Sequence, residues 1–302
     1  MNLLFGDSFV GPFTLIDDDN LYIKKFKGKT IRGISKLDTE DYKILKNIII
    51  DKQKNNKINN IIFMFGQVDI FFSLYYLIFI KKQYNIYEYL QETAENYIKM
   101  LLSLDMIDND KKIVLSIFPS LQEDKYAFYI LFVYKILKPE ELIKIFKKIP
   151  NEFINYVFSY KFRNTCRIYL NNMIKKLCEK NNIKYIDFDN ILIDKKTNKI
   201  NKKLNLLVSP VNIHPMFETI INIYLSKLKF TNIKNKFYGD LDKTKKSYFV
   251  RNKEKIDDHL NIVNELIEKL NNKTTKNNKK YTKIYYDLVK EYNKMKEFNK
   301  KH

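Results

Sequence analysis

Short apolar runs recur along the first two thirds of the chain, and each ends at a residue that interrupts regular structure. They occupy residues 3–5, 61–65, 113–118 and 184–188, and each contains β-branched or aromatic side chains. Gly, Pro or Asp follows every run, as expected of short strands that are buried on both faces. A weaker run at residues 29–34 predicts a fifth strand.

Helical patterns separate these runs, at residues 39–52, at 70–106 with a break near 83–87, and at 163–181. Strands that alternate with helices are typical of a parallel sheet covered by helices on both faces. The intervening helices are long enough for right-handed crossovers. We therefore predict a three-layer α/β fold over residues 1–231, with a central parallel sheet of about five strands flanked by helices.

Two parts of the chain do not follow this alternation. Residues 124–160 are aromatic and helical over a length greater than a crossover needs. They predict additional core helices or, alternatively, a cap over the sheet edge that shapes a pocket. Residues 232–302 predict a basic C-terminal helical extension, with apolar side chains at helical spacing in 257–271. Packing back on the domain, dimerisation and contact with a polyanion all stay open for this extension.

The chain is strongly basic, with 55 Lys and Arg against 35 Asp and Glu and a net charge of +20. Such a charge favours nucleic acid or another polyanion as a partner. However, Lys, Asn and Ile are also the residues that an AT-rich genome enriches, and no dense Arg cluster or nucleic-acid motif accompanies the charge. A polyanion partner is therefore an alternative and not the leading interpretation.

The cysteines and the amino terminus indicate the compartment. Cys166 and Cys178 lie on one predicted helix, where they cannot bridge each other, so reduced thiols are expected. The amino terminus lacks the pattern of a signal peptide, and the apolar run at 71–80 is too short to span a bilayer. We expect a soluble, cytoplasmic protein with no zinc site and no cofactor, whose oligomeric state the sequence does not indicate.

The candidate chemistry centres on Gly6-Asp7-Ser8, directly after the first predicted strand. Open α/β sheets bind ligands at the carboxyl ends of their strands, and a serine placed there is a nucleophile if a base lies within hydrogen-bond reach. Of the three histidines, only His214 falls within the predicted α/β region. We therefore predict Ser8 and His214 as the catalytic pair.

Four blocks of the chain, taken in order, resemble the SGNH (GDSL-type) hydrolases. They are Gly6-Asp7-Ser8, then Gly33, then Gly66 with Asp69, and finally His214. The resemblance implies an SGNH- or flavodoxin-like sheet and a serine esterase or acyltransferase. It also implies that the N–H groups of Ser8 and Gly33 stabilise the oxyanion. The implied substrate is a small acyl ester, such as an O-acetyl group on a carbohydrate.

The chain departs from the family at two positions. The oxyanion asparagine falls at Val68 and the triad acid at Val211, and neither side chain can form a hydrogen bond. Gln67 is the expected substitute donor, and either the Val211 carbonyl or Asn212 is expected to orient His214 in a Ser–His dyad. Loss of one oxyanion donor costs about 10²–10³ in turnover, and loss of the orienting acid about 10⁴.

Two carboxylates are predicted to support the site without taking part in the chemistry. Asp7 is expected to accept backbone N–H groups within its turn. Asp69 is expected to do the same at the start of its own helix, where the helix dipole favours a negative charge.

A second hypothesis belongs to a different class of protein. If Val68 and Val211 have abolished catalysis, the fold serves as an inactive binding or scaffold module. Its basic surface would then bind an anionic polymer such as nucleic acid.

Overall fold

The computed structural model describes residues 1–16, 19–122, 124–127, 149–204, 206, 214–215, 217–228, 261, 290–291, 293–295 and 297–300. Its centre is a five-stranded sheet in the order β2-β1-β3-β4-β5, in which every neighbouring pair is parallel. The strands are β1 (Asn2–Gly6), β2 (Leu21–Lys25), β3 (Asn60–Met64), β4 (Lys112–Leu115) and β5 (Lys184–Ile186).

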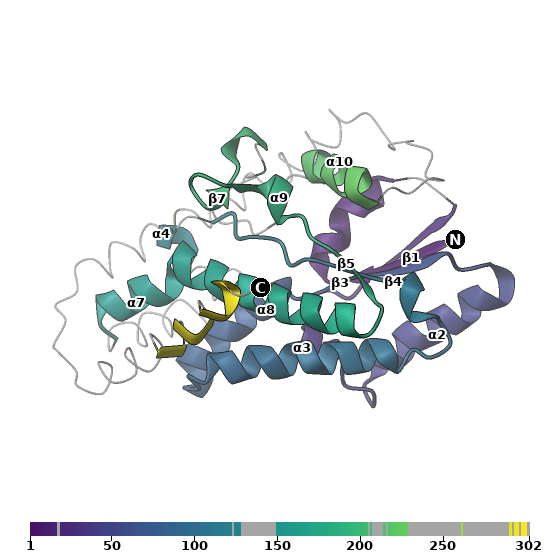
Figure 1. The fold of residues 1–302 in the computed structure, drawn as a ribbon, viewed down its shortest axis with the longest axis horizontal. Helices are drawn as coiled ribbons and strands as arrows, with labels where there is room; N and C mark the ends of the chain where they lie inside the picture. Colours follow the sequence, from purple (N-terminus) through teal and green to yellow (C-terminus); the bar gives the residue numbers. More distant parts are fainter. Residues whose placement is uncertain are drawn as a thin grey trace.

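Helices cover both faces of the sheet (Figure 1). On one face lie α2 (Glu40–Asn55), α3 (Ile86–Leu102) and α8 (Tyr160–Lys180), and α3 packs along α8. On the other face, α10 (Phe217–Leu228) packs against the 3-10 helix η1 (Ser8–Leu15). The fold is therefore the predicted three-layer α/β arrangement.

Burial explains why the strands appear in the sequence as continuous apolar runs. The side chains of Leu3, Leu4 and Phe5 in β1 and of Ile61 and Ile62 in β3 are fully buried. Because helices cover both faces, successive residues of a central strand all face apolar neighbours, and no polar alternation appears.

The strand predicted at residues 29–34 is wrong. Residues Ile31–Ile34 form the short helix α1, and the fifth strand is β2. Thr30 accounts for the helix, because its hydroxyl accepts a hydrogen bond from the Gly33 N–H at 2.8 Å as an N-cap. β2 is an edge strand with partly exposed side chains, so its hydrophobic pattern is weak.

The helical stretch predicted at residues 70–106 is divided close to its predicted break. It begins with two π-helical segments, η2 (Asp69–Ser73) and η3 (Tyr76–Lys81), and continues as α3. Lys82 separates η3 from the residues that lead into α3, and it has the left-handed φ of 53°.

Shorter elements complete the described chain. They are η4 (Asn109–Lys111), α4 (Asp124–Ala127), α7 (Asn151–Phe158), α9 (Asp189–Leu192), the antiparallel pair β6 (Ile193–Asp194) and β7 (Lys199–Ile200), and η5 (Lys202–Leu204). Residues 128–148, which include most of the predicted cap, lie outside the described residues. The cap therefore stays a prediction.

The described end of the C-terminal extension packs against α3 and α8. The Glu291 carboxylate accepts a hydrogen bond from the Tyr87 N–H in the first turn of α3, at 3.2 Å. The Phe298 ring lies 5.0 Å from the Tyr169 ring, and Met295 is fully buried. Of the three alternatives for the extension, these contacts match packing back. The domain boundary at residue 231 falls outside the described chain.

Cys166 and Cys178 are buried free thiols on α8. None of the helices in the described ranges combines the length and the apolar character that crossing a membrane requires.

Candidate functional site

Ser8 and His214 meet at the carboxyl edge of the sheet. Ser8 begins η1 directly after β1, and its Oγ lies 2.7 Å from Nε2 of His214. The ring of Phe9 packs against the imidazole, with 4.8 Å between the ring centroids. The structure therefore brings the two predicted residues within hydrogen-bond distance although 206 positions separate them.

Gly6 allows the tight turn that presents Ser8. A Cβ atom at this position would lie 2.3 Å from Cγ1 of Val10 and 2.4 Å from the Met64 carbonyl oxygen. The Asp7 N–H donates to the same carbonyl at 3.1 Å. Glycine is therefore required where the chain leaves β1 close to the end of β3.

Asp7 holds this turn from inside the protein. Its side chain is fully buried, and Oδ1 accepts a hydrogen bond from the Phe9 N–H at 2.9 Å. Burial raises the pKa of Asp7 from 3.8 to about 8, opposed by backbone N–H groups and reinforced by the charge of Asp69. Asp7 is therefore mostly protonated at neutral pH and holds the turn before Ser8 as a neutral group.

Asp69 ties together the segments that follow β2 and β3. Its Oδ2 accepts a hydrogen bond from the Ile31 N–H, in the first turn of α1, at 2.7 Å. Burial raises the pKa of Asp69 to about 6, while backbone N–H groups led by that of Ile31 lower it. The sequence predicted such contacts within the helix that Asp69 itself begins, whereas this hydrogen bond anchors the start of α1.

Replacing Asp7 with asparagine should stabilise the protein in alkaline solution. Because the folded-state pKa of Asp7 lies above the unfolded value, the folded protein binds more protons than the unfolded chain between about pH 4 and pH 8. The free energy of unfolding therefore falls as pH rises across this range. Asp7→Asn removes this loss and keeps an oxygen for the Phe9 N–H.

Urea unfolding across this range measures the effect. Above about pH 8, Asp7→Asn should exceed the parent by up to several kcal/mol, and the difference should shrink toward pH 4. His214 contributes the same pH dependence to both proteins, so its contribution cancels in the difference between their free energies of unfolding. A constant difference at every pH would show that Asp7 is ionised in the folded protein as it is in the unfolded chain.

The predicted oxyanion donors are only partly in place. The Gly33 N–H donates to the Thr30 hydroxyl in this structure, so its role as an oxyanion donor stays a prediction. The Gln67 side chain is fully buried, and neither its amide nitrogen nor its oxygen has a hydrogen-bond partner within the described part of the chain. Gln67 therefore keeps its donor capacity but lies inside the protein.

The remaining predicted donor is the Ser8 N–H at the start of η1. The N–H groups that open a helix have no intrahelical partner. Asp7 engages the next two, since its carboxylate binds the Phe9 N–H and its carbonyl accepts the Val10 N–H at 3.4 Å. The Ser8 N–H lies at the candidate nucleophile, where the helix dipole favours an anion, and its role as an oxyanion donor stays a prediction.

The imidazole of His214 is neutral at physiological pH. Burial, and to a lesser extent the positive charge of Lys25 at the end of β2, lowers its pKa from 6.5 to about 4. A neutral imidazole is the form that accepts a proton from serine. Val211 and Asn212, the predicted orienting groups, lie outside the described residues, so their role stays a prediction.

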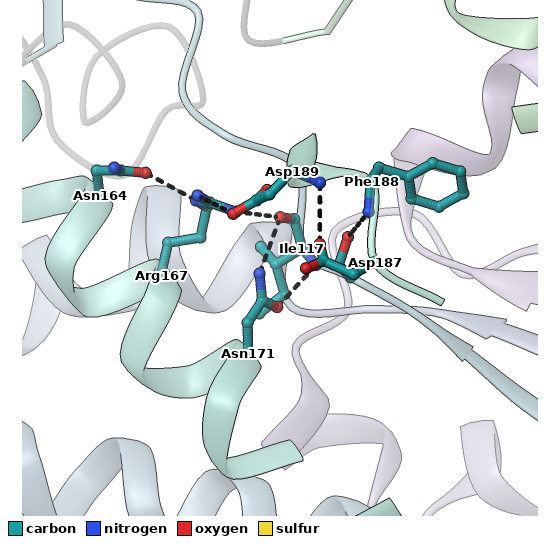
Figure 2. A network of polar contacts seen from close by, with 8 residues as sticks. Ile117, Asn164, Arg167, Asn171, Asp187, Phe188 and Asp189 are labelled. Carbon is teal, nitrogen blue, oxygen red and sulfur yellow. Dashed lines mark hydrogen bonds and ion pairs between the residues drawn. The ribbon is translucent and has the colours of Figure 1, made fainter. Parts of the chain in front are cut away.

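A buried polar network, which the sequence did not reveal, holds the segment after β4 (Figure 2). Both terminal nitrogens of Arg167 bind Asp189, at 2.7 and 2.8 Å, and one also donates to the Ile117 carbonyl at 3.1 Å. Burial disfavours the charge of Arg167, but Asp189 outweighs this effect and the pKa of the guanidinium is raised. The network links α8 to the segments that follow β4 and β5.

Asn171, one turn further along α8, also belongs to this network and clamps the backbone of Ile117. Its Oδ1 accepts from the Ile117 N–H at 2.9 Å, and its Nδ2 donates to the Ile117 carbonyl at 3.3 Å. The clamped segment carries Phe118, whose ring lies 6.0 Å from that of Phe9, the neighbour of the imidazole. Arg163, Arg167 and Asn171 are spaced four residues apart on one predicted helix face, and this spacing is the sequence signal that could have indicated a polar cluster there.

Three comparisons with known proteins leave the family of the chain unassigned. No protein-family model matches the chain, and no curated protein matches it. Among solved structures, the chain is similar to a GDSL-like lipase from Bacteroides thetaiotaomicron VPI-5482. The identity is 10% and the TM-score 0.42, with 76% of this chain and 86% of the lipase covered. These values assign no activity and no residue role to the chain.

Proposed function

We propose that the protein is a serine hydrolase or acyltransferase that acts on ester bonds through Ser8 and His214. The observation that carries this proposal is the 2.7 Å contact between the serine Oγ and Nε2 of the histidine. A serine becomes an effective nucleophile when a base at this distance accepts its proton.

In this reaction, Ser8 Oγ attacks the acyl carbonyl carbon while neutral His214 accepts the hydroxyl proton. The Ser8 N–H stabilises the oxyanion of the tetrahedral intermediate. The imidazolium then donates its proton to the leaving alcohol, and an acyl-serine remains. Water, or a second alcohol in the case of a transferase, attacks the acyl group with His214 again as the base.

The proposed substrate is a small acyl ester, including an O-acyl group on a carbohydrate. The resemblance of the four sequence blocks to the SGNH hydrolases supports this choice. The neutral state of His214 supports it further, since the base is ready to act throughout the physiological pH range.

A serine-directed fluorophosphonate probe tests the proposal. The parent protein should be labelled, because the probe forms a covalent bond with an activated serine, and Ser8→Ala should abolish the labelling. Ser226→Ala is the matched control, since Ser226 is an exposed serine of α10 whose hydroxyl donates to the Ile223 carbonyl. Labelling that survives in Ser8→Ala, or a parent protein that resists the probe, would exclude Ser8 as the nucleophile.

The state of the oxyanion donors favours one alternative, an inactive binding module. The Gly33 N–H is engaged by Thr30, and Val68 offers no polar group. In that case the probe leaves the protein unlabelled, and the basic chain retains RNA or DNA in a manner that weakens steeply with salt.

A further inference from the structure

A cavity of about 650 Å³ lies between α1, η2, η3 and α3. Neither Ser8 nor His214 lines it. Asp69 connects the two places, because it begins η2 and anchors α1 while its charge acts on the buried carboxyl of Asp7. The lining of the cavity includes Arg32, Lys36, Ser73, Tyr76, Lys81 and Asn85.

The lining is cationic. Arg32, Lys36 and Lys81 contribute three positive charges against one negative charge from Glu92. Arg32 is fixed in place, because it binds the Glu92 carboxylate at 3.1 Å and its guanidinium lies 4.7 Å from the centre of the Tyr89 ring. Glu92 engages one of the five N–H donors of this guanidinium. Such a wall attracts an anion and offers it directed hydrogen bonds.

Neutral polar groups and an aromatic face complete the lining. Ser73 and Asn85 bring a hydroxyl and an amide. Tyr76 is 38% exposed and is one of the few large hydrophobic residues that are exposed in the described part of the chain. Hydroxyl and amide groups match the hydroxyls of a sugar, and an exposed ring matches its apolar face.

The backbone around the cavity is unusual in two independent ways. Both π-helical segments contribute lining residues, Ser73 from η2 and Tyr76 and Lys81 from η3. Lys82, directly after η3, has a left-handed φ of 53°. π-helical turns are rare and frequently mark functional sites, and strained backbone gathers where ligands are held. The cavity wall is therefore a specialised structure.

We propose that this cavity binds an acidic sugar unit, with its carboxylate or phosphate held by Lys36, Lys81 and Arg32. Asn85 and Ser73 bind hydroxyls of the ring, and Tyr76 packs against its apolar face. The assignment does not depend on ester hydrolysis at Ser8. If both sites operate, the cavity anchors the saccharide that carries the acyl group.

Isothermal titration calorimetry with four probes tests this binding. They are a galacturonate oligomer, glucose 6-phosphate, neutral maltotriose and inorganic phosphate. At least one acidic sugar should bind at least about tenfold more tightly than maltotriose and inorganic phosphate, since charge-assisted and neutral hydrogen bonds then act together. Preference between the two acidic sugars identifies the anion.

The variant Lys36→Gln/Lys81→Gln should weaken that binding at least about tenfold. The control Lys43→Gln/Lys54→Gln removes two exposed charges of α2 that do not line the cavity, and it should bind as the parent does. Tyr76→Ala should also weaken binding, and its exposed position makes unfolding an improbable cause. Ser8→Ala should bind normally, which separates this proposal from the catalytic one.

Any of four results would overturn the assignment, and the first three concern relative affinities. They are equal binding of acidic and neutral sugars, equal binding of inorganic phosphate and acidic sugar, and equal loss in the cavity and control variants. Absence of binding by every probe would also overturn it.

Discussion

Replacing His214 with glutamine should slow fluorophosphonate labelling and ester turnover by at least about 10³-fold. Glutamine can keep a hydrogen bond to the Ser8 hydroxyl, but it cannot accept the proton that leaves the hydroxyl during attack. The only other histidines are His259 and His302, both in the C-terminal extension. The matched control is His302→Gln at the end of the chain, which should label at the parent rate.

The pH dependence of labelling is a second test of His214 as the base. Because its folded-state pKa is lowered to about 4, the imidazole stays unprotonated well below the 6.5 that is usual for histidine. The labelling rate of the parent should therefore persist through weakly acidic solution and fall only as pH approaches about 4. Parent-like labelling in His214→Gln, or loss of labelling near pH 6.5, would contradict the proposed base and its buried environment.

The sequence was sufficient for the four strands β1, β3, β4 and β5, because burial on both faces leaves an unbroken apolar run in each. The sequence was not sufficient to identify the edge strand. There β2 is half exposed, so the apolar run at residues 29–34 was the more strand-like of two neighbouring segments. One contact, from the Gly33 N–H to the Thr30 hydroxyl, makes that run a capped helix.

For the site, the sequence predicted the pair Ser8 and His214 because few residues of the chain could form such a pair. Few glycines end strands, and one histidine lies in the α/β region. Their contact is visible in the structure, and their catalytic role stays a prediction. The contact of the Gly33 N–H with Thr30 was missed, since a single residue type does not show where an N–H points. The contact from Asp69 to α1 was also missed, because the partners are 38 positions apart.

The Arg167 network shows a third limit of the sequence. An arginine on a helix is ordinarily expected at the surface, yet Arg167 is 1% exposed. Its partners lie at positions 117, 164 and 189. Only the fold of β4 and β5 around α8 brings them together, so the sequence alone does not show which residues these partners are.

Removing Asp189 from this network should destabilise the protein by about 3–5 kcal/mol, because it leaves the Arg167 guanidinium buried without a counter-ion. Arg167→Met should cost less, about 1–3 kcal/mol, since it removes the buried charge together with its hydrogen bonds. The Asp189 side chain is 26% exposed, so water can solvate it once the arginine is gone. Removing Asp189 should therefore lower the free energy of unfolding more than removing Arg167 does, although the two residues form one ion pair.

Urea unfolding of both single variants and the double variant measures this asymmetry. If the cost of Asp189→Ala arises from the stranded cation, the double variant should be close to Arg167→Met alone, with a coupling free energy of about 2 kcal/mol or more. Asp51→Ala, an exposed acidic change on α2, should stay within about 0.5 kcal/mol of the parent. Additive losses in the double variant would mean that the pair does not stabilise the fold as a unit. Since the clamped segment carries Phe118 against Phe9, Asp189→Ala should also slow Ser8 labelling before it unfolds the protein.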